Sequence, residues 1–327
     1  MKKKIKILHI INSLQIGGAE KNLVSLCNYF SKNQNNINYE IHILSIDDIS
    51  SYYKKYLKNI KIYELNYKQN NSALVFLKIY NLINKIDPDL IHSWLYGSDL
   101  IATIISILQK RKNIVWSIRS SNTMRHLNFF NRMFVRILSI FSGIIPKKII
   151  ANSYNGKKDH INLGYEKSKI EVIHNGYNLN NINNFKKTSV RNYLRSQIGI
   201  DKDYTLIGNI GRDHPMKDHS TFIKSAYFLK KKINKVKFLI LGKGIKQNKK
   251  LLKQIDVKNL KNDVILLEPK SVDISDIYQI LDIFCLTSSD SEGFPNVLVE
   301  SIINNTLTVS TDVGDSTKIV NDPNLII

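Results

Sequence analysis

Short apolar runs alternate with longer amphipathic stretches along almost the whole chain. Hydrophobicity within each run is continuous rather than alternating, which is typical of strands covered on both faces of a parallel sheet. The stretches between them have the length and pattern of helices, so the chain is predicted to consist of repeated strand–helix–strand units. The expected strands span residues 5–11, 39–46, 60–65, 89–94, 113–118, 148–152, 170–174, 204–210, 236–242, 263–267, 282–287 and 307–311.

A polar, asparagine-rich segment interrupts this alternation near residues 175–203. The chain has 327 residues, which is more than one hydrophobic core usually supports. We therefore expect two Rossmann-like α/β domains, residues 1–178 and 204–327, joined by a linker region at 179–203. Open parallel sheets bind ligands beyond the carboxyl ends of their strands, so functional residues are expected directly after predicted strands, in a cleft that the two domains face.

The formal net charge of +21 is compatible with several kinds of partner. A basic surface attracts nucleic acid, anionic lipid or phosphorylated substrates, but a chain rich in Lys, Asn and Ile also acquires such a charge from a general compositional bias. Since the sequence contains no recognisable nucleic-acid-binding motif, no nucleic-acid partner is expected. Charge alone therefore assigns no partner.

Location and redox state follow from short segments of the chain. The first apolar run is too short for a signal peptide and suits a buried strand, and no stretch reaches the roughly 18 apolar residues of a membrane span. Cys27 and Cys285 lie far apart in the sequence, each in an apolar stretch, and are expected to be buried free thiols in a reducing compartment. A cytoplasmic protein is the expectation.

Glycine-containing turns follow the first predicted strand of each half. Gly17 and Gly18 precede a helical stretch, where glycines let a backbone approach a ligand and a helix N-terminus attracts anions; a plain tight turn is the alternative. In the second half, Gly211 is followed by Arg212 and Lys217, a forked donor and a point charge that suit a diphosphate. Two solvated surface cations are the alternative there.

The most informative segment is EGFPNVLVE, residues 292–300, directly after a predicted strand. Pro295 suits the first position of a helix, whose N-terminus can bind a phosphate. Glu292 precedes that terminus, and Glu300 lies about one turn into the helix, where its carboxylate can accept hydrogen bonds from a ribose. Alternatively, Glu292 interacts only with the helix dipole and Glu300 is a solvated helix residue.

This segment resembles the glutamate–seven-residues–glutamate motif of retaining glycosyltransferases with the GT-B fold, and the chain is most similar to glycosyltransferase family 4. The resemblance extends over nearly the whole chain, through the segments NSLQIGGAEKNL, PDLIHSWLYGSDL, ANSYNGKKDHINLGY, VIHNGYN, IGNIGRDHPMKDH and TDVGDS. It implies transfer of a sugar, with retention, from a nucleotide-sugar donor to a glycan or lipid-linked acceptor. Synthesis of a cell-surface polysaccharide such as capsule or O-antigen is the implied context.

The resemblance also implies roles for individual residues. Arg212 and Lys217 would bind the donor diphosphate, Glu292 the sugar hydroxyls and Glu300 the nucleotide ribose. The family uses no essential metal and the sequence has no convincing Asp-x-Asp site, so no metal is expected; two cations and a helix N-terminus can supply the charge that a metal otherwise gives. The remaining binding residues would be Gly293, Phe294, Pro295 and Asn296 along the sugar and phosphate, and Gly18 with Gly17 beside the diphosphate or acceptor.

Two features depart from the family pattern. Many relatives place a histidine near the donor sugar, after the strand expected at 113–118, where this chain has Arg119 as a ligand of phosphate or of sugar. His92 and His126 are nearby in the sequence, and we expect either to be structural or exposed rather than catalytic. The chain also ends at Ile327, whereas relatives usually continue, so the C-terminal helices are expected to be shortened and the interdomain clamp weakened.

Residues 128–148 are apolar and carry Arg132, Arg136, Lys147 and Lys148. A basic, partly amphipathic helix suits contact with an anionic membrane, which would place the protein peripherally at the inner face of the cell membrane. A core helix packed on the sheet is the alternative, and we favour it.

Other functions stay open at this level. A GT-B-like nucleotide-sugar epimerase would convert the nucleotide sugar without an acceptor. A truncated, non-catalytic remnant would transfer no sugar. A basic nucleic-acid-binding protein would show steeply salt-dependent binding to DNA or RNA.

Overall fold

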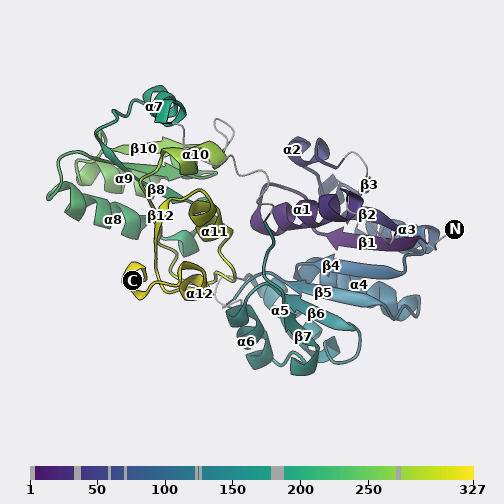
Figure 1. Ribbon diagram of the computed structural model, residues 1–327. Coiled ribbons are helices and arrows are strands. Elements are labelled where there is room, and N and C mark those ends of the chain that lie inside the picture. The colour runs from purple at the N-terminus through teal and green to yellow at the C-terminus, as the bar shows by residue number, and fades with distance from the viewer. Residues whose placement is uncertain are drawn as a thin grey trace. The chain divides into compact units, whose positions relative to one another are not determined.

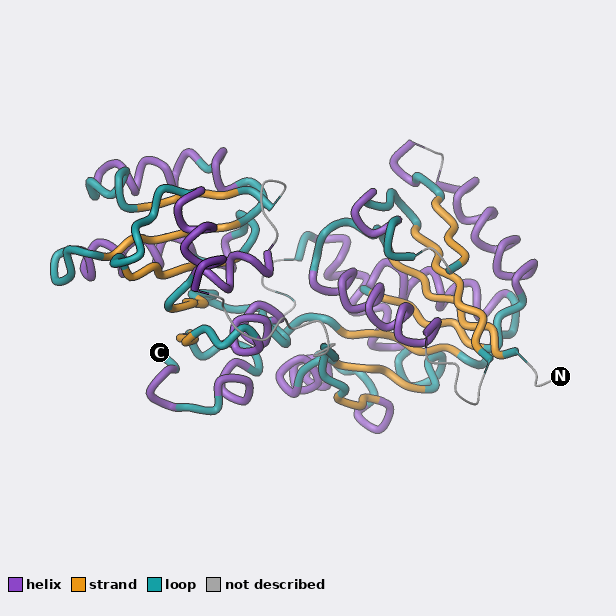
Figure 2. The backbone as a smooth tube through the Cα atoms, turned by 45° about the horizontal axis from the view of Figure 1, so that its top comes forward, coloured by secondary structure: helices purple, strands orange, loops and turns teal. Residues whose placement is uncertain are grey.

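The computed structural model describes residues 4–32, 38–57, 60–69, 72–121, 124, 127–177, 188–269 and 274–327. The chain divides into two compact units, Met1–Tyr177 and Asn178–Ile327. Each unit is a parallel sheet with helices packed on its faces (Figure 1 and Figure 2). All the strands predicted from the hydrophobic pattern are present, with ends that differ by at most two residues, which confirms the α/β fold class.

The first unit contains a seven-stranded sheet in the order β3-β2-β1-β4-β5-β6-β7. Helices α3, α4 and α5 contribute to the core on one face, whereas α1 and α2 contribute to the core on the other. The strands are β1 (Ile5–Ile11), β2 (Tyr39–Ser45), β3 (Lys61–Glu64), β4 (Leu90–Trp94), β5 (Ile114–Ile118), β6 (Lys148–Ala151) and β7 (Ile170–Val172). The helices are α1 (Gly18–Lys32), α2 (Ser51–Lys54), α3 (Ser72–Ile86), α4 (Tyr96–Leu108), α5 (Phe129–Phe141) and α6 (Tyr154–Asn162).

The second unit contains a five-stranded sheet in the order β10-β9-β8-β11-β12. The strand order reverses at β8, whose neighbours are β9 and β11, and ligands of such sheets bind at this switch point. The strands are β8 (Thr205–Ile210), β9 (Val236–Leu241), β10 (Val264–Leu267), β11 (Ile283–Leu286) and β12 (Leu307–Ser310). The helices are α7 (Thr188–Gln197), α8 (His219–Lys230), α9 (Lys249–Val257), α10 (Ile274–Ile280), α11 (Asn296–Ile303) and α12 (Ser316–Val320).

Helix α7 lies inside the range 179–203 that the sequence assigns to a linker, and it is part of the second unit. Its Arg195 is buried and donates hydrogen bonds to the carbonyl oxygens of Ile280 and Tyr204, both at 3.0 Å, and to a carboxylate oxygen of Asp282 at 2.6 Å. Arg191 forms a second ion pair with Asp282. These contacts attach α7 to the segment before β11 and to the start of β8.

Both cysteines are free thiols, as the sequence predicts. Cys27 is buried in α1 as expected, whereas Cys285 in β11 is only half-buried, contrary to the prediction. Desolvation still raises the pKa of the Cys285 thiol to about 11. In the part of the chain that the structure describes, no helix is both long enough and apolar enough to cross a membrane.

Candidate functional site

The loop after β8 is fixed by close backbone packing and by side-chain caps. A Cβ atom on Gly242, after β9, would lie 1.8 Å from the carbonyl oxygen of Gly211, so only glycine fits where the ends of these strands meet. His214 accepts a hydrogen bond from the backbone N–H of Met216 at 3.3 Å, which caps the short helical turn Pro215–Lys217. These contacts fix the backbone that carries Lys217.

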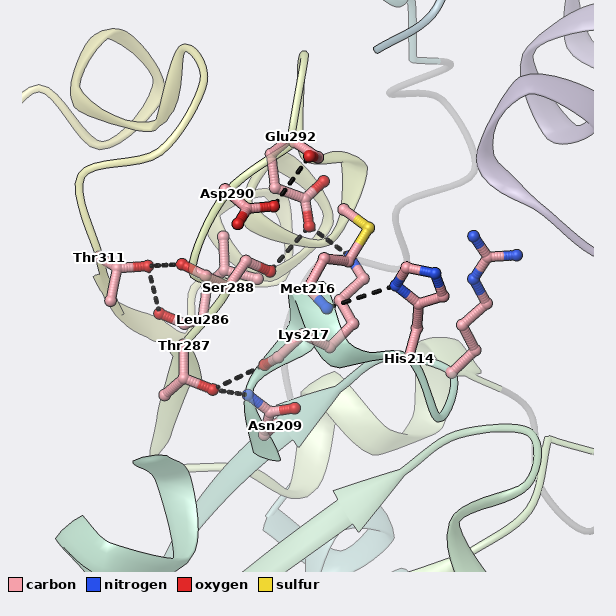
Figure 3. A network of polar contacts seen from close by, with 12 residues as sticks. Asn209, His214, Met216, Lys217, Leu286, Thr287, Ser288, Asp290, Glu292 and Thr311 are labelled. Atoms are coloured by element: carbon pink, nitrogen blue, oxygen red, sulfur yellow. Dashed lines mark hydrogen bonds and ion pairs between the residues drawn. The ribbon is translucent and has the colours of Figure 1, made fainter. Parts of the chain in front are cut away.

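Lys217 forms an ion pair with Glu292 (Figure 3). Glu292 is only 8% exposed, and the same carboxylate oxygen also accepts a hydrogen bond from the Ser288 hydroxyl at 2.8 Å. The pair joins the loop after β8 to the loop after β11. Two residues that the sequence indicates separately therefore meet at the switch point of the second sheet.

Polar side chains at the ends of apolar strands hold these two loops together. The backbone N–H of Ser289 donates to the carbonyl oxygen of Met216 at 2.8 Å. The Thr287 hydroxyl lies 3.1 Å from the Lys217 carbonyl oxygen, and it accepts a hydrogen bond from the Asn209 amide at 3.1 Å (Figure 3). The sequence prediction assigned no role to Asn209, Thr287 or Ser288, whose signal is a polar side chain at the end of an otherwise buried apolar strand.

The TDVGDS segment, after β12, supports the same site. Thr311 donates a hydrogen bond to the carbonyl oxygen of Ser288 at 2.6 Å, and the Asp315 N–H donates to that of Gly293 at 3.0 Å. Gly314 has a φ of +56°, and a Cβ atom there would lie 2.4 Å from the carbonyl oxygen of Glu292. A third strand end thus fixes the backbone around Glu292.

The EGFPNVLVE segment differs in one detail from the sequence prediction. Pro295 was expected as the first helical residue, but its ψ of 102° is extended, so it precedes α11, which begins at Asn296. Proline has no side-chain acceptor, and this helix N-terminus has no side-chain cap. Gly293 is buried with Pro295, whereas Phe294 and Asn296 are half-buried.

Glu300, on α11, accepts a hydrogen bond from the hydroxyl of Tyr278 at 3.1 Å. Tyr278 is 1% exposed and lies on α10, so a buried side chain of the neighbouring helix orients the Glu300 carboxylate. No sequence pattern singles out Tyr278. Arg212 is exposed, and within the described residues its side chain has no hydrogen bond or ion pair, so of the two predicted cations only Lys217 contacts Glu292.

The glycines predicted in the first unit occupy the expected turn. Gly18 begins α1, and Gly17 precedes it. A Cβ atom on Gly17 would meet only the carboxylate end of Glu20, at 2.3 Å, and that flexible side chain can move.

Arg119 follows β5, and its guanidinium carbon lies 4.1 Å from the ring centroid of Trp94. Asn175 accepts a hydrogen bond from Nη1 at 2.9 Å. Burial lowers the pKa of Arg119 to about 10, and the negative charge of Asp99 counteracts that shift. His92 is buried beside this group, and His126 lies outside the described residues.

No cluster of three or more His, Cys, Asp or Glu side chains suited to a metal ion occurs among the residues that the structure describes.

The family model for Glycosyltransferase Family 4 matches residues 16–181, half of the chain. The chain belongs to glycosyltransferase family 4. A second family model, Glycosyl transferases group 1, matches residues 190–324. The first match covers most of the first unit of this glycosyltransferase, and the second match covers most of its second unit.

Curated relatives and solved structures agree with this assignment. The chain is 27% identical over 315 residues to the Campylobacter jejuni N-acetylgalactosamine-N,N'-diacetylbacillosaminyl-diphospho-undecaprenol 4-alpha-N-acetylgalactosaminyltransferase, covering 92% of this chain and 79% of the relative. It is 22% identical to the Staphylococcus aureus capsular polysaccharide biosynthesis glycosyltransferase CapH, covering 96% and 83%.

Among solved structures, Anabaena HepE in complex with UDP and glucose is similar with a TM-score of 0.82 and 21% identity, covering 96% of this chain and 82% of that one. WaaG, a glycosyltransferase involved in lipopolysaccharide biosynthesis, is similar with a TM-score of 0.72 and 13% identity, covering 98% and 85%. At such identities the likeness establishes the fold, which is GT-B.

Proposed function

We propose that this family 4 member is a retaining glycosyltransferase that moves a hexosyl group from a nucleotide-sugar donor to a glycan or lipid-linked acceptor in polysaccharide or glycolipid synthesis. The observation that carries the proposal is the Lys217–Glu292 pair at the switch point of the second sheet. The bound UDP and glucose of HepE support a nucleotide-sugar donor. The diphospho-undecaprenol acceptor in the name of the C. jejuni enzyme supports a lipid-linked acceptor.

In this proposal the protein positions the substrates and stabilises developing charge. As the bond between sugar and diphosphate breaks, negative charge grows on the leaving diphosphate, and the Lys217 ammonium and Arg212 guanidinium stabilise it. Glu292 accepts hydrogen bonds from sugar hydroxyls, and Glu300, held by Tyr278, accepts them from the ribose. The acceptor hydroxyl attacks on the face that the diphosphate leaves, so no protein nucleophile is needed. Gly293, Phe294 and Asn296 line the sugar and phosphate.

The test is turnover with a panel of nucleotide sugars and a lipid-linked acceptor, in the presence of EDTA. We expect one donor to stabilise the protein against heat, and its sugar to appear on the acceptor with the anomeric configuration of the donor. Because the charge is supplied by side chains, EDTA is expected to leave the rate unchanged. Conversion of the nucleotide sugar without acceptor would instead identify an epimerase. An inverted product or a loss of activity in EDTA would contradict the mechanism.

We also propose that the protein acts peripherally at the inner face of the cell membrane, through the outer face of α5. Val135 and Leu138 of this helix are buried in the core, whereas Phe129 and Phe130 are 76% and 64% exposed. Arg132 and Arg136 of the same helix are exposed as well. The helix thus packs on the sheet with one face and presents aromatic and basic side chains with the other, which suits an anionic lipid surface.

Vesicle sedimentation tests this contact. Replacing Phe129 and Phe130 by serine is expected to lower binding to anionic vesicles at low salt by about tenfold, since the buried area of two aromatic rings is lost. Replacing Phe228 and Val257 by serine is the matched control, because both are equally exposed but lie on the second unit. Unchanged binding of the α5 variant, or no binding of the wild type, would refute the contact.

A further inference from the structure

Arg119 is a partly buried cation with unused hydrogen-bonding capacity. It lies at the carboxyl edge of the first sheet. Its guanidinium carbon lies 4.1 Å from the ring centroid of Trp94, the last residue of β4. Nη1 donates to Asn175 at 2.9 Å, and Nη2 makes a long contact of 3.4 Å with the Ser117 hydroxyl. Its Nε atom is buried and has no hydrogen-bond partner.

The neighbouring imidazoles are neutral and add no further positive charge beside Arg119. The indole N–H of Trp94 donates to Nδ1 of His9 at 3.2 Å, which leaves the proton of that ring on Nε2. His92 Nε2 lies 2.7 Å from the Ser117 hydroxyl. Burial lowers the pKa of His9 to about 3 and that of His92 well below its usual value.

The acid that interacts with Arg119 is Asp99, and it is buried as well. One of its carboxyl oxygens accepts a hydrogen bond from Ser93 at 2.5 Å, and burial raises the pKa of this carboxyl well above its usual value. Within the described residues, Arg119 forms no direct ion pair with a carboxylate. The guanidinium is therefore oriented by an aromatic ring and an amide but not neutralised by a bonded partner.

We propose that Arg119 binds an oxyanion, a phosphate or a carboxylate, that is carried by a substrate of the first unit. A partly buried cation without a bonded anion lowers stability unless a ligand completes it. The planar fork of a guanidinium matches both oxyanions, and ligands of parallel sheets bind at this edge. The inference rests on the proposed function, because it takes the ligand to be a donor or an acceptor.

Arg119→Met separates ligand binding from a structural role. Methionine keeps the apolar contact with Trp94 and removes the charge and the donors. A ligand-binding arginine predicts an unchanged or raised Tm together with weaker substrate binding, whereas a purely structural arginine predicts a lowered Tm. Arg111→Gln is the matched control. Arg111 follows α4 and pairs with Asp87, away from the carboxyl edge of the strands.

Calorimetric titration of the full chain identifies which oxyanion is bound. The probes are UDP, UDP-glucose, UDP-glucuronate and a short prenyl diphosphate. We expect Arg119→Met to weaken binding by about tenfold or more for at least one probe, since charged hydrogen bonds are lost. A loss shared by all the uridine nucleotides assigns the donor diphosphate, a loss confined to UDP-glucuronate assigns a carboxylate, and a loss confined to the prenyl compound assigns an acceptor diphosphate.

Equal affinities of Arg119→Met and wild type for every probe would overturn the inference, and so would a lowered Tm with unchanged binding. Lys217→Ala distinguishes this outcome from failure of the proposed function. If Lys217→Ala weakens nucleotide binding and Arg119→Met leaves the binding of every probe intact, the inference about Arg119 is overturned and the proposed function is not. A wild type that binds none of the probes overturns both.

Discussion

Replacing Lys217 by alanine is expected to lower kcat/KM for sugar transfer by about 100- to 1,000-fold, the range for losing one group that stabilises charge in a transition state. The Lys217 ammonium is placed by the turn Pro215–Lys217 and by its pair with Glu292. In the proposed mechanism, alanine removes this charge from beside the leaving diphosphate. Steady-state kinetics with the donor identified by thermal stabilisation measures the effect, and the Tm shows whether the variant is folded.

Two further variants locate the cause of that loss. Glu292→Gln keeps the size of the side chain and its contact with Ser288 but removes the carboxylate. If Lys217 acts on the diphosphate, combining both substitutions lowers the rate beyond either one alone. Arg212→Ala is expected to have a smaller effect, because the exposed guanidinium is not held in place. A Lys217→Ala variant that is folded and within tenfold of the wild-type rate would contradict the assignment.

Replacing Asp282 by alanine is expected to lower the free energy of unfolding of the second unit by about 2–3 kcal/mol. The substitution leaves the buried Arg195 guanidinium without its carboxylate and the Leu206 N–H without its acceptor at 2.8 Å. The figure lies below the range for a fully buried pair because the Asp282 side chain is 36% exposed. Denaturant unfolding measures it.

The same contacts give Asp282 a defined pH dependence. Burial raises the pKa of the Asp282 carboxyl. The Leu206 N–H and the Arg195 guanidinium lower this pKa by more than burial raises it, so the pKa in the folded protein lies below 3.8. A lowered carboxyl pKa means that the stabilisation is present above the unfolded pKa and is lost as pH falls through the folded one. Asp203→Ala is the control, since its pair with Lys235 is exposed, and it should leave the unfolding midpoint unchanged. Equal effects of the two substitutions would contradict the role of Asp282.

The sequence predicted what depends on local pattern. Buried parallel strands are continuous apolar runs, so their positions could be found, and with them the loops that carry Lys217 and Glu292. Contacts between distant segments could not be found in this way. The hydrogen bond from Tyr278 to Glu300 joins two helices, and nothing in either segment distinguishes that tyrosine from other buried aromatic residues.

Two features of residues 188–295 could likewise not be predicted from the local sequence. Helix α7 is polar in sequence, and it is attached to the second unit by Arg191 and the buried Arg195, whose shared partner Asp282 lies more than 80 positions away. The start of α11 differs by one residue from the prediction. Proline is favoured at the first helical position, whereas Pro295 has an extended ψ of 102° and precedes the helix.

The ion pair with Glu292 holds the Lys217 side chain in one orientation. A lysine side chain loses up to about 2 kcal/mol of rotamer entropy when it is immobilised. Here most of that entropy is lost once, during folding, rather than each time a donor binds. In the proposed mechanism, each arriving donor molecule therefore meets a cation that is already ordered, and the stability of the fold, not the affinity for the donor, carries the cost of ordering it.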